Sequence, residues 1–302
     1  NLPRTVLKSV DEAKNITEVL VDNSHMKERF DALNMPQPRI TTMKNAYGQE
    51  MNVLYMFPPE WTEGTEVQFP VLMYMYNGPG SQLVTKSFSG MHNAFSMYMA
   101  SQGFIVATVD ARGTGFKGIE YMTCTYKNLG EKEVEDQIYA AKVIGARADT
   151  DRSRISIWGW SDGGYMASKA ISSTLNQGVF RLGLSVAPVT DWAYYDSAYT
   201  ERYMQWPAIN KFGYENSSVI TQVRHPQCPM LPTEHKDKKT GEVSLEQSNT
   251  RFVLVHGTGD DNVHPLNAFN LMTELQNSRV QFESMFYANK DHSISGPNTR
   301  RH

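Results

Sequence analysis

A serine flanked by glycines is the strongest chemical signal in the sequence. Ser161 lies in Gly159-Trp160-Ser161-Asp162-Gly163, which matches the pattern G-x-S-x-G. Residues 155–158 have strand-like spacing, and apolar residues recur at helical spacing from Met166. A strand, a sharp turn with a serine and a helix are typical of a nucleophile elbow, whose glycines leave space that β-carbons would fill. We expect the Asp162 N–H to face the same point as the Ser161 hydroxyl.

A serine hydroxyl becomes a strong nucleophile when a base takes its proton and a carboxylate orients that base. In elbow folds the acid and then the histidine follow the serine, each on a loop after a strand. The apolar run 252–255 leads to Asp260, and the last apolar run leads to His292. We therefore predict a triad of Ser161, Asp260 and His292. The alternatives are Asp261 and Asp191 for the acid, and His264 and His302 among the histidines that follow Asp260.

An oxyanion hole needs a second donor besides the Asp162 N–H. Tyr76 ends the apolar run 69–76 and precedes Asn77-Gly78-Pro79-Gly80, so its phenol is a candidate. A buried core tyrosine fits the same pattern equally well.

The stretch 113–118 matches G-x-G-x-x-G but does not indicate a dinucleotide site. That fingerprint needs a helix that opens inside it, whereas Asp110-Ala111-Arg112 intervenes and we expect the next helix at about Glu131. Histidines and carboxylates do not recur at metal-ligand spacing either. We expect no cofactor and no metal.

The elements that must position these side chains alternate between strands and helices. Such alternation predicts a mostly parallel central sheet with helices on both faces, the α/β class. Residues 40–44 and 51–57 predict an antiparallel hairpin around Gly48. Further strands are predicted at 69–76, 104–109, 154–158, 181–187, 252–255 and 280–286, and helices at 93–102, 131–148, after the elbow and at 265–276.

Composition describes an ordinary globular chain of 302 residues, with 40% hydrophobic residues and a net charge of −3. The sequence has no basic stripe, which argues against nucleic acid, and no apolar run that would span a bilayer. Residues 1–38 predict a connector with a short helix around 27–33, and 39–302 one catalytic domain with an exposed excursion at 225–250.

Two cysteines, Cys124 and Cys228, are too few for a disulfide framework, and the sequence leaves open whether they pair. Sequons at Asn15 and Asn216 favour a glycoprotein with an extracellular or cell-surface location.

Several strings together resemble the catalytic domain of the prolyl oligopeptidase family, and within it the dipeptidyl peptidase IV type. They extend over nearly all of 70–292. The resemblance implies an α/β-hydrolase fold, and a fragment without the family's β-propeller and C-terminal helix. The strings are Tyr76-Asn77-Gly78-Pro79-Gly80-Ser81-Gln82, Asp110-Ala111-Arg112-Gly113-Thr114-Gly115, Gly159-Trp160-Ser161, Ala187-Pro188-Val189, Tyr194-Tyr195-Asp196-Ser197, Tyr199-Thr200-Glu201-Arg202-Tyr203-Met204, His256-Gly257-Thr258 and Asp260-Asp261-Asn262-Val263.

The resemblance implies a serine exopeptidase that releases N-terminal dipeptides with proline or alanine second, through an acyl-enzyme on Ser161. It implies the same triad, an oxyanion hole of the Tyr76 hydroxyl and the Asp162 amide, and a homodimer in the full-length protein. An esterase of the same fold and a non-catalytic binding homologue are the alternatives. The implied substrate contacts are an apolar pocket of Val189, Trp192, Tyr195, Tyr199 and Val263, with Arg202 and Asn262 orienting the substrate carbonyl or the tyrosines.

Asp162 departs from this resemblance, because close relatives usually have a tyrosine there. Its carboxylate adds negative charge near the oxyanion hole, so we expect weaker turnover or altered specificity.

Overall fold

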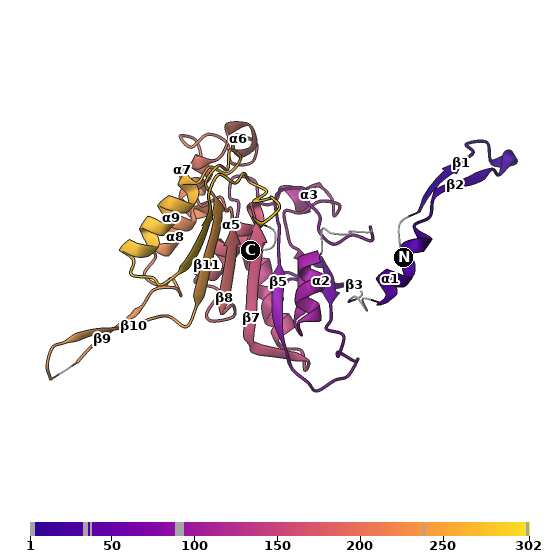
Figure 1. Ribbon diagram of the computed structural model, residues 1–302. Coiled ribbons are helices and arrows are strands. Elements are labelled where there is room, and N and C mark those ends of the chain that lie inside the picture. The colour runs from indigo at the N-terminus through magenta and orange to yellow at the C-terminus, as the bar shows by residue number, and fades with distance from the viewer. Residues whose placement is uncertain (1–3, 33–35, 37, 88–93, 238, 300–301) are drawn as a thin grey trace.

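The computed structural model describes residues 4–32, 36, 38–87, 94–237, 239–299 and 302. In this part of the chain an eight-stranded sheet has the order β12-β11-β8-β7-β5-β6-β4-β3 (Figure 1). Neighbours from β12 to β6 pair in parallel, whereas β4 pairs antiparallel with both β6 and β3. The predicted mostly parallel sheet is confirmed. Its strands are β3 (Pro38–Lys44), β4 (Glu50–Met56), β5 (Phe69–Tyr74), β6 (Ile105–Asp110), β7 (Thr150–Trp160), β8 (Leu182–Val186), β11 (Arg251–Gly257) and β12 (Glu283–Tyr287).

Helices cover both faces of this sheet, as predicted. Alternation along β7 explains the two layers, because Ile155 and Ile157 belong to one apolar cluster and Trp158 packs against another. The first cluster lies under α4 (Lys132–Gly145) and α5 (Asp162–Ser172), and every residue of α5 is buried. The second includes Ala100 of α2 (Ala94–Ser101), a helix predicted to begin at Asn93, which lies outside the described residues.

Short helices were harder to predict than long ones. The expected 265–276 helix is α9 (Leu266–Asn277), and the aromatic stretch after β8 forms a 3-10 turn, η4 (Trp192–Tyr194), and α6 (Ser197–Met204). Unpredicted helices are α3 (Ile119–Thr123), α7 (Lys211–Ser217) and α8 (Val219–Val223).

The helix α3 corrects the prediction that no helix begins between the glycine-rich stretch and Glu131. The glycine-rich stretch nevertheless packs against protein: the Gly115 N–H donates to the Ser81 carbonyl at 2.8 Å, and a Cβ on Gly115 would lie 2.6 Å from the Gly80 carbonyl oxygen. The glycine at 115 is needed for this backbone contact.

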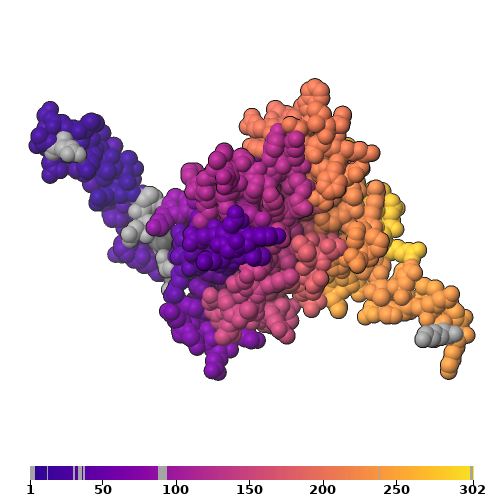
Figure 2. Space-filling model, turned by 180° about the vertical axis from the view of Figure 1, so that it is seen from behind, coloured from indigo at the N-terminus to yellow at the C-terminus, as the bar shows by residue number. Residues whose placement is uncertain are grey.

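Two hairpins project from the sheet. The first hairpin pairs β1 (Thr5–Lys8) with β2 (Thr17–Val21), and both strands are exposed throughout (Figures 1 and 2). It lies in the predicted connector, which also contains η1 (Glu12–Lys14), η2 (Ser24–Met26) and α1 (Lys27–Ala32). The predicted helix around 27–33 is confirmed as far as Ala32, and Leu33 lies outside the described residues; the hairpin was not predicted. The boundary near residue 38 stays a prediction. The second hairpin, β9 (Thr233–Lys236) with β10 (Val243–Glu246), is the predicted exposed excursion.

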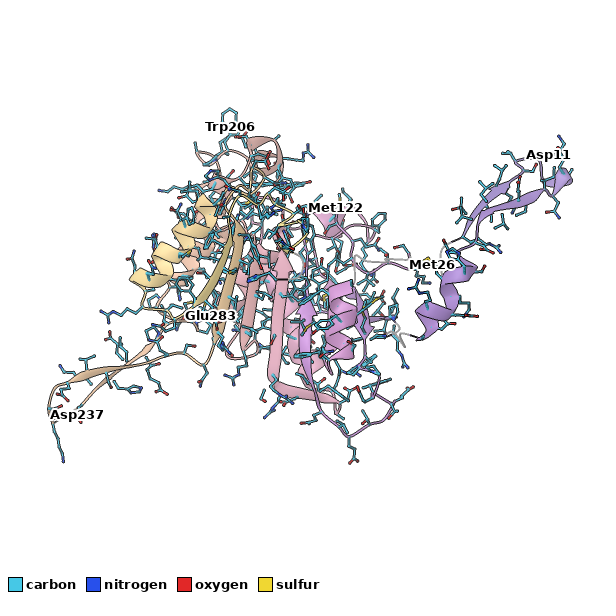
Figure 3. All side chains as sticks on the ribbon, viewed as in Figure 1. Asp11, Met26, Met122, Trp206, Asp237 and Glu283 are labelled. Carbon is cyan, nitrogen blue, oxygen red and sulfur yellow. The ribbon has the colours of Figure 1, made fainter. Side chains whose placement is uncertain are left out.

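The parallel strands end at the edge of the sheet where α3 and α6 lie. Glu283, the first residue of β12, is at one end of the sheet, and Trp206, which follows α6, is at the other, with Met122 of α3 on the same side (Figure 3). Side chains on the loops after β5, β7, β11 and β12 therefore share one end of the molecule.

One buried carboxyl behind this end is paired at only one oxygen. Glu133 of α4 is 2% exposed; its Oε1 accepts the Gly130 N–H at 3.1 Å, and its Oε2 has no partner among the described residues. Burial raises the pKa of Glu133 to about 8. The carboxyl is therefore protonated at pH 7 in the folded protein and ionised in the unfolded chain.

Glu133→Gln is expected to flatten the pH dependence of stability. Because the folded pKa lies above the unfolded value, the proton stabilises the fold fully only below the unfolded pKa, and this stabilisation is lost as pH rises towards 8. Relative to the parent, the variant should gain roughly 3 kcal/mol between pH 5.5 and pH 8 in urea unfolding. Glu120→Gln, at an exposed glutamate of α3, is the control. A constant difference between variant and parent across this range would contradict the prediction.

Candidate active site

The turn after β7 has the geometry of a nucleophile elbow. Ser161 has φ 61° and ψ −120°, a conformation that L-residues rarely adopt. A Cβ on Gly159 would lie 2.3 Å from the Gly163 carbonyl oxygen. A Cβ on Gly163 would lie 2.2 Å from the Met75 carbonyl oxygen, and a Cβ on Gly164 would lie 2.6 Å from the Val186 carbonyl oxygen. The three glycines therefore allow the turn to contact its own backbone, β8 and the end of β5.

Backbone hydrogen bonds hold Ser161 in this conformation. Its N–H donates to the Val186 carbonyl, and its carbonyl accepts from the Tyr165 N–H, both at 2.9 Å. Asp162 is the first residue of α5, so its N–H has no acceptor within the helix. The helix dipole and this N–H favour negative charge beside Ser161.

Asp260 and His292 meet at the same end of the sheet. Asp260 follows β11 and His292 follows β12, and His292 Nδ1 lies 2.7 Å from Asp260 Oδ2. The nitrogen donates to the carboxylate, which leaves Nε2 of the neutral ring as the proton acceptor. Among the alternatives, Asp191 caps η4, Asp261 and His264 are exposed, and His302 contacts Tyr287.

The Asp260 carboxylate is buried and fully hydrogen-bonded. Its Oδ1 accepts the N–H groups of Asn262 at 3.0 Å and Val263 at 2.9 Å. Burial alone would raise the pKa of Asp260, but hydrogen bonds from His256 and His292 outweigh it and hold that pKa well below its usual value. The group is therefore a fixed negative charge beside His292.

His256 is a contact that the sequence analysis missed. The side chain of His256 is fully buried in β11. Its Nε2 lies 2.8 Å from the Val263 carbonyl oxygen and 3.3 Å from Asp260 Oδ2. A carbonyl only accepts, so Nε2 carries the proton. The interval of four residues between His256 and Asp260 was the signal available in the sequence.

Trp160 connects the elbow to the histidine loop. Its indole Nε1–H donates to the His292 carbonyl at 2.9 Å. Trp160 immediately precedes Ser161, and it packs with Val186, Ala187 and Ile294 in one apolar cluster. The structure therefore brings the backbones that carry Ser161 and His292 together.

Tyr76 follows β5 and lies next to the elbow. Built at Gly78, a Cβ would be 3.5 Å from the Tyr76 hydroxyl and 3.3 Å from the Tyr199 hydroxyl, so both phenols lie over this turn. Burial, and then the charge of Asp162, raise the pKa of Tyr76 well above its usual value. The phenol therefore remains a hydrogen-bond donor at any working pH.

The Asp162 carboxyl points to the turn after Tyr76. Its Oδ2 accepts the Asn77 N–H at 3.0 Å, and the residue is 7% exposed. Burial raises the pKa of Asp162 to about 6, although the Asn77 N–H opposes the shift. The expected charge near Tyr76 is therefore present at neutral pH, and a hydrogen bond to the backbone fixes its position.

The three aromatic residues among the predicted substrate contacts form one group. Trp192 stacks on Tyr199 with ring centroids 5.8 Å apart, and Tyr195 meets both rings edge-on. The Tyr195 hydroxyl donates to Asn262 Oδ1 at 2.9 Å, which links the group to the Asp260 loop. Val189 and Val263 are buried in the same cluster. Arg202 is exposed, and its guanidinium carbon lies 6.0 Å from the centroid of the Tyr203 ring.

Within the described ranges, the structure holds no group of three histidine, cysteine or acidic side chains that would bind a metal. Cys124 and Cys228 are unpaired. Of the helices that the structure describes, none has the length and apolar character to cross a bilayer.

The two sequons differ in accessibility. Asn15 is exposed, whereas the Asn216 amide is half-buried and donates to Asn128 Oδ1 at 2.8 Å. Glycosylation and an extracellular or cell-surface location stay predictions, and the exposed Asn15 is the better acceptor.

Comparison with known proteins assigns the chain to a family. The model of the prolyl oligopeptidase family matches residues 88–302, which is more than half of the chain. The chain belongs to the prolyl oligopeptidase family. The resemblance inferred from sequence motifs is thereby confirmed.

Relatives in this family are similar over almost the whole chain. Dipeptidyl-aminopeptidase B of Aspergillus niger is 39% identical over 293 residues, and "Probable dipeptidyl-aminopeptidase B" of Arthroderma benhamiae is 38% identical over 291 residues. Each alignment covers 96% of this chain but 29% of the relative. The crystal structure of Porphyromonas gingivalis dipeptidyl peptidase 4 has a TM-score of 0.81 and 37% identity, over 94% of this chain and 36% of that one. The chain thus spans about a third or less of these family members.

Gly163→Ala is expected to destabilise the fold severely. The new Cβ would lie 2.2 Å from the Met75 carbonyl oxygen, and the nearest atoms are all backbone of Met75 and Tyr76, so no flexible side chain can yield. We expect a loss of at least about 3 kcal/mol in thermal unfolding, or no folded protein.

The matched control is Gly64→Ala, where φ is +81° but nothing lies within 4 Å of the new Cβ. It should cost about 1 kcal/mol through backbone strain alone. Equal losses in the two variants would disprove the close contact at the elbow.

Proposed function

We propose that this chain is the catalytic domain of a serine exopeptidase that releases N-terminal dipeptides with proline or alanine in second position. The observation that carries the proposal is the 2.7 Å pair of Asp260 and His292 on a loop tied to the strained Ser161 turn, in a member of the prolyl oligopeptidase family. The names of the relatives as dipeptidyl peptidases support the same activity.

In this mechanism His292 Nε2 removes the Ser161 proton as Oγ attacks the carbonyl carbon of the scissile bond. Asp260 holds the imidazole in the required tautomer and stabilises the imidazolium that forms. The imidazolium then returns the proton to the leaving amine, and an acyl-enzyme remains on Ser161. A water molecule, deprotonated by the same imidazole, hydrolyses it.

The negative charge of the tetrahedral intermediate would be stabilised by the Asp162 N–H and the Tyr76 hydroxyl. The raised pKa of Tyr76 supports this role, because the phenol keeps its proton while the oxyanion forms. Donors fixed before the reaction need no reorganisation, which makes such sites effective.

Substrate selectivity is assigned to the group of Trp192, Tyr195 and Tyr199. A pyrrolidine ring makes no hydrogen-bond demand and packs well on aromatic faces. Asn262 would orient the Tyr195 hydroxyl, consistent with their 2.9 Å hydrogen bond, and Arg202 would act on the substrate carbonyl.

The test uses the full-length chain with two substrates and a covalent probe. Gly-Pro-p-nitroanilide should be hydrolysed and a fluorophosphonate should label Ser161, while Ser161→Ala should lose both, with activity falling roughly 10⁴-fold or more. Ser153→Ala, at the other end of β7, is the control serine. Labelling with turnover of p-nitrophenyl acetate alone would favour the esterase, and absence of labelling would favour a binding homologue.

A homodimer is the second part of the proposal. One edge of the sheet supports it: β12 is an edge strand, and Phe269 of α9 and Met285 of β12 are 47% and 38% exposed. Sedimentation velocity of the full-length chain should give twice the monomer mass. Met285→Lys should shift that measured mass towards the mass of the monomer. A monomer at micromolar concentration would exclude the dimer.

A further inference from the structure

The Asp162 side chain joins two segments that are far apart in sequence. Asp162 is the first residue of α5, directly after the Ser161 turn. Its Oδ2 accepts the N–H of Asn77, the residue after Tyr76, at 3.0 Å. The strands that lead to these turns, β7 and β5, are parallel neighbours. The hydrogen bond therefore closes the gap between the nucleophile turn and the Tyr76 turn.

The Asn77 side of this contact is buried. Asn77 is 1% exposed, and its Oδ1 accepts Gln137 Nε2 at 2.8 Å. The same Gln137 nitrogen donates to the Val109 carbonyl at 2.8 Å, which anchors the turn to β6. Without an acceptor at residue 162, the Asn77 N–H would be a buried donor with no partner, which costs more than the bond itself contributes.

The backbone at residues 76 and 77 determines where the Tyr76 phenol points. Both turns are in contact beneath it, since a Cβ on Gly163 would lie 2.2 Å from the Met75 carbonyl oxygen. A donor to an oxyanion must be correctly placed to within a fraction of an ångström, and a displacement of about 1 Å can reduce the rate about 100-fold.

We propose that Asp162 is a positioning residue, which through its hydrogen bond to the Asn77 N–H sets the Tyr76 hydroxyl in place as an oxyanion donor. This inference rests on the proposed function, because it assigns Tyr76 that role. The acceptor oxygen is what the geometry requires. An amide oxygen at the same place would serve as well as a carboxylate.

The other titratable groups around Asp162 do not supply a competing donor in the structure. They are Tyr76 after β5, Glu133 of α4, Tyr165 of α5, Tyr195 just before α6 and Tyr199 within α6. The Tyr165 hydroxyl donates to the carbonyls of Leu129 or Ser217, and that of Tyr195 to Asn262. Among the described residues, the Asn77 N–H makes the only hydrogen bond to the Asp162 carboxyl.

Asp162→Ala and Asp162→Asn separate the acceptor from the charge. In the full-length chain at pH 8, Asp162→Ala should lower kcat for Gly-Pro-p-nitroanilide about 10- to 100-fold, with KM within about threefold. Asp162→Asn should have a kcat at least about 10-fold above that of Asp162→Ala, because its amide oxygen can accept the same N–H. An equal fall in both variants would overturn the proposal. If Asp162→Ala does not fold, Asp162→Ser, whose side chain is one atom shorter, replaces it.

A double-mutant cycle with Tyr76→Phe tests whether Asp162 acts through the phenol. In the Tyr76→Phe background, Asp162→Ala should change kcat by less than about threefold, because the group that it positions is gone. An effect as large as in the parent would overturn the proposal.

Hydrogen exchange gives a readout that does not depend on activity. The amides of 75–80 should exchange at least about 10-fold faster in Asp162→Ala and at the parent rate in Asp162→Asn. Asp151→Ala removes an acceptor from the Ser153 N–H at the opposite end of β7 and is the control. Unchanged exchange in Asp162→Ala would overturn the inference even in an active enzyme. An unlabelled Ser161 with the expected exchange pattern would instead count against the proposed function alone.

Discussion

The site depends on how closely the backbone of the Ser161 turn approaches its neighbours. Three positions in six residues leave no space for a β-carbon, and the serine between them has a positive φ. Strain of this kind costs of order 1–3 kcal/mol and persists only where the surroundings over-determine it. Here β8 accepts the Ser161 N–H and the first turn of α5 begins from the Ser161 carbonyl.

The burial of α5 provides what the strained turn needs. All of its residues are buried between the sheet and its neighbours α4 and α8, so the helix is fixed in direction and depth. A helix that cannot shift keeps its amino-terminal N–H groups aimed at one point beside Ser161. The largest apolar cluster of the structure thus fixes the proposed site in place as well as stabilising the fold.

The outline of the fold could be predicted because it is encoded locally. The apolar runs of β5, β6 and β11 are continuous, and the sequence order of Ser161, Asp260 and His292 follows from the strands that precede them. Short helices such as α3 have too few residues for a period to be visible, and the β1–β2 hairpin lacks alternation between buried and exposed positions.

Contacts within the site were harder to predict, since they depend on packing between distant segments. The sequence indicated the backbone role of Asp162 but not its bond to Asn77, 85 positions away. Likewise, the interval of four residues between His256 and Asp260 does not by itself distinguish a histidine that contacts the carboxylate from an ordinary core histidine. Only the alignment of parallel strands at one edge brings these groups within reach.

The indole of Trp160 holds a carbonyl that lies 132 positions further along the chain. During synthesis, at roughly 5–20 residues per second, the serine turn leaves the ribosome several seconds before that loop exists. A growing chain therefore has the proposed nucleophile without the imidazole assigned as its base. The order of translation itself would keep such a hydrolase inactive towards other unfinished polypeptides until its last strand has joined the sheet.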